Sequence, residues 1–173
     1  VAPGMAIVLA ELGQQGFSGF GCDFGSGATR ISLAHHGVEL FSTRTARGGD
    51  WIDARLAESE GCILFDSEGH RYLNTTSISR WKRANLISVH TPITERERRL
   101  SLLCEEVIDE ALQALREQLA GNRTVRTLHD PLPLVCAGGL ASVPGFRELL
   151  FGMVRNAKLP VSISEVRRCS EMD

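Results

Sequence analysis

The sequence predicts an α/β fold, in which a mixed five-stranded sheet is flanked by helices and carries a small insert. The order of the segments is the first observation: helix, three-stranded meander, helix, insert, long helix, strand, helix, strand. Right-handed crossovers would place the two late strands beside the first one. Two glycine-rich turns, 24–28 and 138–139, would then share one edge of the sheet, where open α/β sheets usually bind ligands.

Size and composition indicate a single domain, 1–173. The 173 residues are 43% hydrophobic and carry a net charge of −2, which is enough apolar material for a core. The near-neutral charge argues against nucleic acid and anionic membranes as partners. No apolar run approaches the ~20 residues that span a bilayer. No signal peptide is visible, so we expect a cytoplasmic location, and a start at Val1 is compatible with a piece of a longer protein.

The first quarter of the chain reads as a helix followed by three strands. Apolar spacing predicts a helix over 4–14 that stops at glycines 13 and 16. Alternating apolar residues predict three strands with a turn at His36-Gly37 between the last two, over 19–24, 29–35 and 38–46. His35 and His36 point to opposite faces of a strand, which favours exposed turn residues over a metal pair.

A second helix and a small insert follow. We expect Asp50 to cap a helix that ends before Gly61. The insert, at about 62–91, contains a hairpin that turns at 66–69. A short helix over 77–87 comes next, and Leu86–Val89 reads as a short strand or as the end of that helix.

The second half begins with the longest predicted helix. Thr94 and Glu97 have the spacing of a capping box, and one apolar stripe continues to Gly121-Asn122. Leu132 to Ala137 is a strand of the buried type. Pro144 is expected to open the next helix, and 159–163 is the last predicted strand.

The five cysteines are odd in number and include no C-x-x-C pair. Cys22 and Cys136 lie in apolar strand-like runs, and Cys104 lies on the apolar side of the long helix. We interpret them as buried free thiols in a reducing cytoplasm rather than as disulfides or zinc ligands.

The turn after the first strand has the composition of an anion site. Asp23 ends the strand, and 24–29 supplies two glycines and two hydroxyl groups. Glycine lets the backbone approach a ligand, and N–H groups that converge in such a turn can hold an anion. A carboxylate beside bound phosphate is expected mainly where Mg²⁺ lies between them. A plain hairpin turn that binds nothing has the same composition.

Three motifs in order carry a resemblance to a known family. Gly21 through Thr29, Gly48 through Asp53 and Leu134 through Gly145 resemble the second half of the actin-like ATPase superfamily, which includes actin, heat-shock chaperone ATPases, bacterial actin-like proteins and sugar kinases. The first motif is similar to that family's second phosphate loop, and the last to its adenosine loop. Residues 4–14 look like the helix that joins the two lobes. The resemblance implies a ribonuclease H-like fold.

The resemblance also implies a role for each matching residue. Asp23 would be the catalytic carboxylate that positions Mg²⁺, directly or through water. The β- and γ-phosphates of ATP or ADP would be faced by Gly25, Ser26, Gly27 and Thr29. The ribose or phosphates would lie near Gly48 and Gly49, and the adenosine near Gly138, Gly139 and Ser142. Lys82 and Arg83 match a basic nucleotide contact poorly, and a solvated charged face is the preferred interpretation.

Several features of this sequence depart from the family pattern, and they bear on whether the chain hydrolyses ATP. Arg30 stands where the family usually has an acidic residue, and Ser26 stands where glycine is frequent. The first phosphate loop and the helix that normally follows the last strand are absent, and the insert is short. We therefore expect a nucleotide-binding lobe that needs a missing first lobe, or a protein partner, for a complete site and for ATP hydrolysis.

Two other functions stay open. The chain is alternatively an actin-fold scaffold or protein-interaction module that hydrolyses nothing, which Arg30 and the short insert favour. A lobe of a sugar or acid kinase is a third interpretation, although no substrate pocket is evident. No G-x-S-x-G elbow supports a serine hydrolase, and the sequence does not predict an oligomeric state.

Overall fold

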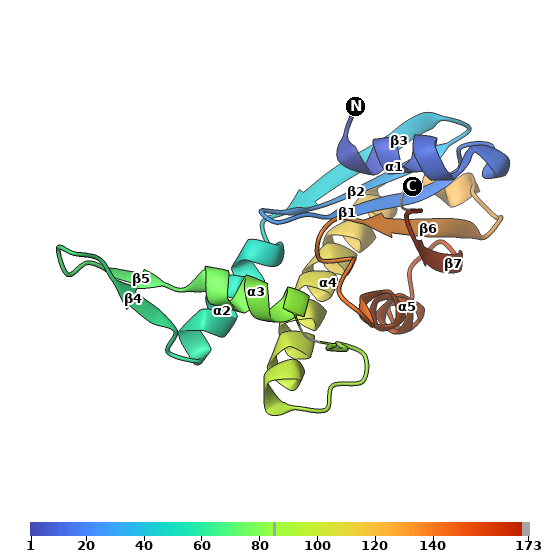
Figure 1. Ribbon diagram of the computed structural model, residues 1–173. Coiled ribbons are helices and arrows are strands. Elements are labelled where there is room, and N and C mark those ends of the chain that lie inside the picture. Colours follow the sequence, from blue (N-terminus) through green and yellow to red (C-terminus); the bar gives the residue numbers. More distant parts are fainter. Residues whose placement is uncertain (85, 171–173) are drawn as a thin grey trace.

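A five-stranded mixed sheet forms the centre of the protein in a computed structural model that describes residues 1–84 and 86–170 (Figure 1). Its strands are β1 (Gly19–Phe24), β2 (Thr29–His35), β3 (Val38–Thr45), β6 (Leu132–Ala137) and β7 (Ile163–Arg168). They lie in the order β3-β2-β1-β6-β7. The first three form an antiparallel meander, and β6 and β7 run parallel to β1. The predicted α/β fold is confirmed.

Helices cover both faces of the sheet (Figure 1). The helix α1 (Pro3–Glu11) lies on one face, where Val8 packs with Val135 of β6. The helices α4 (Glu95–Gly121) and α5 (Phe146–Asn156) lie on the other face and form the main core with Phe20 and Phe24 of β1. Two short 3₁₀ turns, η1 (Gly13–Gln15) and η2 (Val125–Thr127), connect helices to strands. No helix in the described ranges is long and apolar enough to cross a membrane.

Two glycines set the distance between α1 and the sheet. A Cβ atom added at Gly21 of β1 would lie 1.9 Å from the carbonyl oxygen of Gly4. A Cβ atom added at Gly4 would lie 2.7 Å from the backbone nitrogen of Ser32. Helix and strand therefore touch through their backbones, which a larger residue at either position would prevent.

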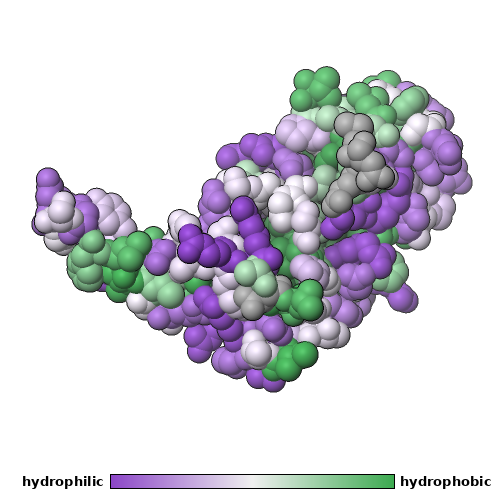
Figure 2. Space-filling model, in the orientation of Figure 1, coloured by the Kyte–Doolittle hydropathy of each residue, from purple (hydrophilic) through white to green (hydrophobic). Residues whose placement is uncertain are grey.

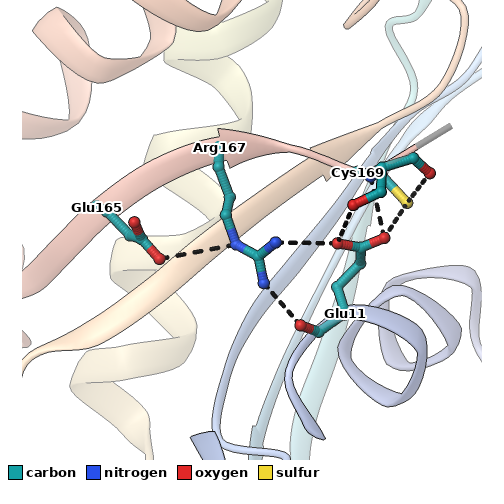
Figure 3. Close-up of polar contacts among 5 residues, drawn as sticks. Glu11, Glu165, Arg167 and Cys169 are labelled. Carbon is teal, nitrogen blue, oxygen red and sulfur yellow. Dashed lines mark hydrogen bonds and ion pairs between the residues drawn. The ribbon is translucent and has the colours of Figure 1, made fainter. Parts of the chain in front are cut away.

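The end of β7 is tied to the end of α1 through Glu11 (Figure 3). The guanidinium of Arg167 donates to the Glu11 carboxylate at 3.0 Å and to its carbonyl oxygen at 2.6 Å. The thiol of Cys169 and the backbone N–H of Ser170 donate to the same carboxylate at 3.1 and 3.0 Å. Partial burial acts to raise the pKa of Glu11, but the hydrogen bonds and the charge of Arg167 outweigh it and lower that pKa.

A small insert follows the helix α2 (Gly49–Ser59) and consists of β4 (Ile63–Phe65), β5 (Arg71–Leu73) and α3 (Thr75–Ala84). The β4–β5 hairpin projects from the body of the protein (Figure 1). Its turn is held by Asp66, whose carboxylate accepts the backbone N–H groups of Glu68 and His70 at 2.9 and 2.8 Å. Figure 2 shows apolar side chains on this arm, and the exposed ones are Leu64, Phe65, Tyr72 and Leu73.

The start of α2 corrects one expectation. Asp50 does not cap the helix, because α2 begins at Gly49 and Asp50 is its second residue. The N–H groups of Gly49 and Asp50 instead donate to the carbonyl oxygens of Gly25 and Ser26, at 3.0 and 2.9 Å. The backbone of a neighbouring turn thus satisfies helix donors that a capping side chain would otherwise satisfy.

Pro144 does not open α5, which begins at Phe146. Gly145 has a left-handed φ of 82°, and the carbonyl oxygen of Pro144 accepts the N–H of Val89 at 3.0 Å, so these residues belong to a loop. The last strand runs over Ile163–Arg168 rather than over 159–163.

The insert also differs from its expected boundaries. The short helix runs from Thr75 to Ala84 rather than over 77–87, and 86–89 forms neither a strand nor a helix. Residue 85, which falls inside the expected helix, and the polar chain end at 171–173 lie outside the described residues.

Two other predictions are confirmed. Thr94 and Glu97 form the capping box of α4, with reciprocal bonds of 3.2 and 3.3 Å between side chain and backbone N–H. The cysteines Cys22, Cys104 and Cys136 are buried and free. Burial raises the pKa of Cys104 to about 12 and that of Cys136 to about 11, so these thiols stay protonated and unreactive at neutral pH.

Candidate functional site

The two glycine-rich turns meet where β1 and β6 end, as the sequence predicts. Asp23 of β1 pairs in parallel register with Ala137 of β6, and the N–H of Leu140 donates to the carbonyl oxygen of Phe24 at 3.2 Å. Gly138 has a φ of 98°, and a Cβ atom added there would lie 2.4 Å from that same oxygen. Only glycine allows the second turn to lie this close to the first.

The first turn presents unused backbone donors to solvent. It closes with a hydrogen bond of 3.1 Å from the N–H of Gly25 to the carbonyl oxygen of Ala28. Ser26 and Gly27 at its tip are exposed, and their N–H groups meet no acceptor among the described residues. The space around Gly27 is open, since no atom lies within 4 Å of an added Cβ atom. Two adjacent free N–H groups form the kind of concavity that binds anions.

The Gly48-Gly49 turn supports the first turn from behind. A Cβ atom added at Gly48 would lie 2.4 Å from the carbonyl oxygen of Ser26 and 2.6 Å from that of Gly25. The hydrogen bonds from Gly49 and Asp50 use those same two oxygens. The carbonyl groups of Gly25 and Ser26 therefore point toward α2.

Asp23 lies between the two turns. A Cβ atom added at Gly25 would lie 3.6 Å from the Asp23 carboxylate, and one added at Gly138 would lie 2.9 Å from it. Its carboxylate forms an ion pair with the guanidinium of Arg30 at 3.4 Å, and the two side chains are 21% and 36% exposed. Arg30 is also its partner across the β1–β2 ladder, so strand register brings the two charges together.

Thr29 is buried, and its hydroxyl group is already engaged. Its Oγ1 atom donates to the carbonyl oxygen of Arg47 at 3.0 Å. The Arg47 side chain pairs with Glu106 at 3.1 Å and Glu110 at 3.0 Å on α4, and its guanidinium lies 4.4 Å from the ring centre of Trp51. Thr29 thus anchors the turn to α4 through Arg47. Sequence reasoning did not single out Arg47, and no local pattern identifies it.

Gly139 and Ser142 lie in the turn that follows β6. The space around Gly139 is open, and Ser142 is exposed with its hydroxyl donating to the carbonyl oxygen of Gly138 at 3.4 Å. An open pocket of about 370 Å³ adjoins them and is lined by Ala141, Ser142, Val143, Pro144, Gly145, Arg147, Glu148 and Arg168.

A larger open pocket, of about 640 Å³, lies between α2 and α3. Its lining includes Asp50, whose backbone N–H donates to the carbonyl oxygen of Ser26 in the first turn. Its lining is mostly polar and includes charges of both signs. The lining residues are Asp50, Asp53, Thr75, Thr76, Ser79, Arg80, Arg83 and Ala84. The sequence did not predict this pocket, because α2 and α3 are separated by a hairpin and their facing residues follow no motif.

Lys82 corrects the expectation of a solvated charged face. Its ammonium group forms an ion pair with Asp53 of α2, and the two side chains are only 13% and 11% exposed. Burial raises the pKa of Asp53 above its ordinary value, and the hydrogen bond and charge of Lys82 only partly offset this. Arg83 is exposed, as expected.

The Asp23 carboxylate is a candidate ligand for a metal ion beside a bound phosphate, since Mg²⁺ at such sites is usually held by one or two carboxylates together with phosphate oxygens and water. Mg²⁺ takes hard oxygen ligands from carboxylates, phosphates and water. Within residues 1–84 and 86–170, no group of three or more His, Cys, Asp or Glu side chains is placed to hold a metal ion. Asp23 is the carboxylate between the turns, and the adjacent guanidinium already neutralises it. A metal ion held by Asp23 would therefore have to displace Arg30 from the carboxylate.

Comparisons with known proteins agree with this architecture. A family model described as Volactin matches residues 1–172. No curated protein matches the chain. Among solved structures, a non-polymerising MamK mutant bound to AMPPNP superposes with a TM-score of 0.61 at 14% identity, over 95% of this chain and 53% of that one.

Two further structures are similar. The ethanolamine utilization protein EutJ from Carboxydothermus hydrogenoformans has a TM-score of 0.53 at 18% identity, over 87% of this chain and 44% of that one. A chain of the PilM–PilN type IV pilus biogenesis complex has a TM-score of 0.52 at 18% identity, over 85% of this chain and 34% of that one. The fold is therefore actin-like, and this chain spans between about a third and a half of these structures.

Proposed function

Because this chain belongs to the Volactin family and has an actin-like fold, we propose that it is the nucleotide-binding lobe of an actin-like ATPase. The observation that carries the proposal is the meeting of two glycine turns at the ends of β1 and β6. The free N–H groups of Ser26 and Gly27 are the expected contacts for the phosphates of ATP or ADP.

The wider surroundings support the rest of a nucleotide. Gly139 leaves room for a flat ligand to approach the backbone, with Ser142 at the margin, whereas the space beside Gly138 is filled by the backbone of Phe24. The pocket between α2 and α3 begins beside the same turn and offers Arg80 and Arg83 as cations. We propose that the phosphates bind at the turn and that the nucleoside extends into one of these pockets.

The site is incomplete in this chain alone. The MamK relative is bound to AMPPNP, and this chain covers about half of it. We propose that a first lobe or a protein partner covers the nucleotide from the other side, and that hydrolysis, if it occurs, requires that cover. Phosphoryl transfer depends on positioning and charge neutralisation, which a half site supplies only in part. The buried free thiols favour a cytoplasmic location.

A scaffold that hydrolyses nothing is the second candidate function. The projecting β4–β5 hairpin favours it, because Leu64, Phe65 and Tyr72 are exposed although nothing in the fold needs them there. A PilM–PilN complex is among the relatives, which makes a protein partner plausible for this fold. Measured ATP turnover in the full-length protein would argue against a pure scaffold.

One substitution tests the nucleotide proposal directly. Gly27→Asp places a carboxylate at the tip of the first turn, in open space, where it repels phosphate without a steric clash. Gly27→Asn is the matched control, because it has nearly the same shape and no charge. We expect calorimetric titration of the full-length protein with ATP and ADP to show binding that Gly27→Asp weakens at least tenfold more than Gly27→Asn. Equal affinities in both variants, or no binding at millimolar nucleotide, would refute the site.

A further inference from the structure

Charged side chains of both signs lie beside the first turn. Asp23 and Arg30 are partners across the β1–β2 ladder, and their side chains form an ion pair at 3.4 Å. Arg44 of β3 is the next residue across the sheet from Arg30 and is exposed. Neighbours across a ladder point to the same face, so two guanidinium groups and one carboxylate share this face beside the turn.

Asp23 and its partner Arg30 lie beside the turn to which the proposed nucleotide site assigns the phosphates. The Asp23 carboxylate is within 4 Å of the position that a Cβ atom would take at Gly25, the residue before the exposed tip of the turn. Arg30 is 36% exposed, so its guanidinium is accessible from solvent while it contacts Asp23. Its guanidinium is therefore available to an anion that approaches the turn on the side of Asp23.

A divalent cation at the same place would be disfavoured. A metal ion recruited by Asp23 has to displace Arg30, and two cations beside one carboxylate repel each other. A guanidinium offers phosphate a fixed fork of donors, and it needs no deprotonation and no exchange of water. The two cations are thus competitors for one role, the neutralisation of phosphate charge.

We infer that Arg30 is a specificity-determining residue of this site and takes the place of a divalent cation as the counter-ion of the polyphosphate. The inference rests on the proposed nucleotide site. Arg30 exchanges its contact with Asp23 for one with a phosphate oxygen when the ligand binds. The site accordingly accepts ATP or ADP free of metal, and divalent cations add little to the affinity.

Calorimetric titration of the full-length protein with ATP, once in excess Mg²⁺ and once in a chelator, tests this inference. We expect dissociation constants within about threefold of each other for the unmodified protein. We expect Arg30→Gln to weaken metal-free binding by about tenfold or more, as the loss of a charge-assisted hydrogen bond implies. Arg30→Glu should abolish metal-free binding and make the remaining affinity depend on Mg²⁺, because it places a second carboxylate beside Asp23.

Arg123→Gln is the matched control, since it removes an exposed positive charge at the opposite end of the sheet, before β6. Thermal melts without nucleotide establish that each variant is folded. Binding that requires Mg²⁺ in the unmodified protein, with the same requirement in Arg30→Gln, would overturn the inference and leave the nucleotide site in place. Absence of binding with and without Mg²⁺ would remove the nucleotide site and the inference together.

Discussion

Lys82 of α3 and Asp53 of α2 form an ion pair that is almost completely shielded from solvent, with 13% and 11% of their side chains exposed. The pair joins the small insert to the helix that supports the first glycine turn. A more exposed ion pair joins Glu60 to Arg96 of α4 at 2.7 Å, and the Arg96 guanidinium lies 4.0 Å from the ring centre of Trp81 in α3. The buried Lys82–Asp53 pair therefore helps to fix the position of the insert relative to the candidate site.

Lys82→Met should destabilise the protein by about 3 kcal/mol at pH 8, because it leaves a buried carboxylate without its partner. The pKa of Asp53 is already raised, and the loss of Lys82 raises it further. Folded Asp53 then binds a proton more tightly than unfolded Asp53, so the stability of the variant falls as pH rises from the ordinary pKa of 3.8 through the raised one. The loss of stability should be small in acid and should reach about 3 kcal/mol at pH 8.

Urea unfolding of the full-length protein at several pH values measures this effect. The double variant Lys82→Met with Asp53→Leu is the control, and it should recover most of the lost stability because no buried charge remains. A defect of equal size at pH 4 and pH 8 would show that Lys82 stabilises the fold through packing alone.

Gly48→Ala should lower stability by about 1–3 kcal/mol, the usual range for a side chain forced into a packed region. Its methyl group would lie 2.4 Å from the carbonyl oxygen of Ser26 and would push α2 away from the first turn. Gly152→Ala in α5 is the matched control, because its surroundings are open and alanine favours the helix by about 0.5–1 kcal/mol. A Gly48→Ala protein as stable as the unmodified one would disprove the tight contact.

Asp23→Asn distinguishes a metal ligand from a counter-ion of Arg30. The amide has the shape of the carboxylate but no charge, so it holds Arg30 less strongly. We expect metal-free ATP to bind a few-fold more tightly to this variant, as measured by calorimetry on the full-length protein. A loss of affinity seen only in the presence of Mg²⁺ would instead assign Asp23 to the metal.

Glu11→Gln should loosen the contact between β7 and α1. The pKa of Glu11 is lowered in the folded state, so the charged carboxylate contributes stability above its ordinary pKa of 4.5, and this contribution is lost as pH falls through the lowered value. We expect a fall in Tm of about 2–4 °C at pH 7, which corresponds to roughly 1 kcal/mol in a domain of this size. The difference should vanish in strong acid. Glu39→Gln, an exposed carboxylate on β3, should leave Tm unchanged.

Most of the fold could be predicted because its signals are local. The alternation of β2 and β3, the capping box at Thr94 and the buried run of β6 each depend on nearby residues. The errors arose where distant backbone decides the outcome. The start of α2 is set by carbonyl groups of Gly25 and Ser26, and the loop at Pro144 by its bond to Val89.

In the candidate site, too, the local features could be predicted and the contacts between distant segments could not. Glycine spacing located the turns after Asp23 and Ala137, and chain topology brought them together. The ion pair of Lys82 with Asp53 and the anchoring of Thr29 by Arg47 follow from packing between elements, and they leave no pattern in the sequence. The sequence identifies Arg30 only as a departure from a family pattern. The strand register of the structure shows that it contacts Asp23.

Hydrogen–deuterium exchange of the full-length protein, with and without saturating ATP, tests the central claim most directly. The account predicts slower exchange in peptides that cover 24–28 and 137–142, since both turns would face the ligand, and unchanged exchange in the β4–β5 hairpin at 63–73. Unchanged exchange in both turns at a nucleotide concentration that saturates binding would contradict the account and place the nucleotide elsewhere.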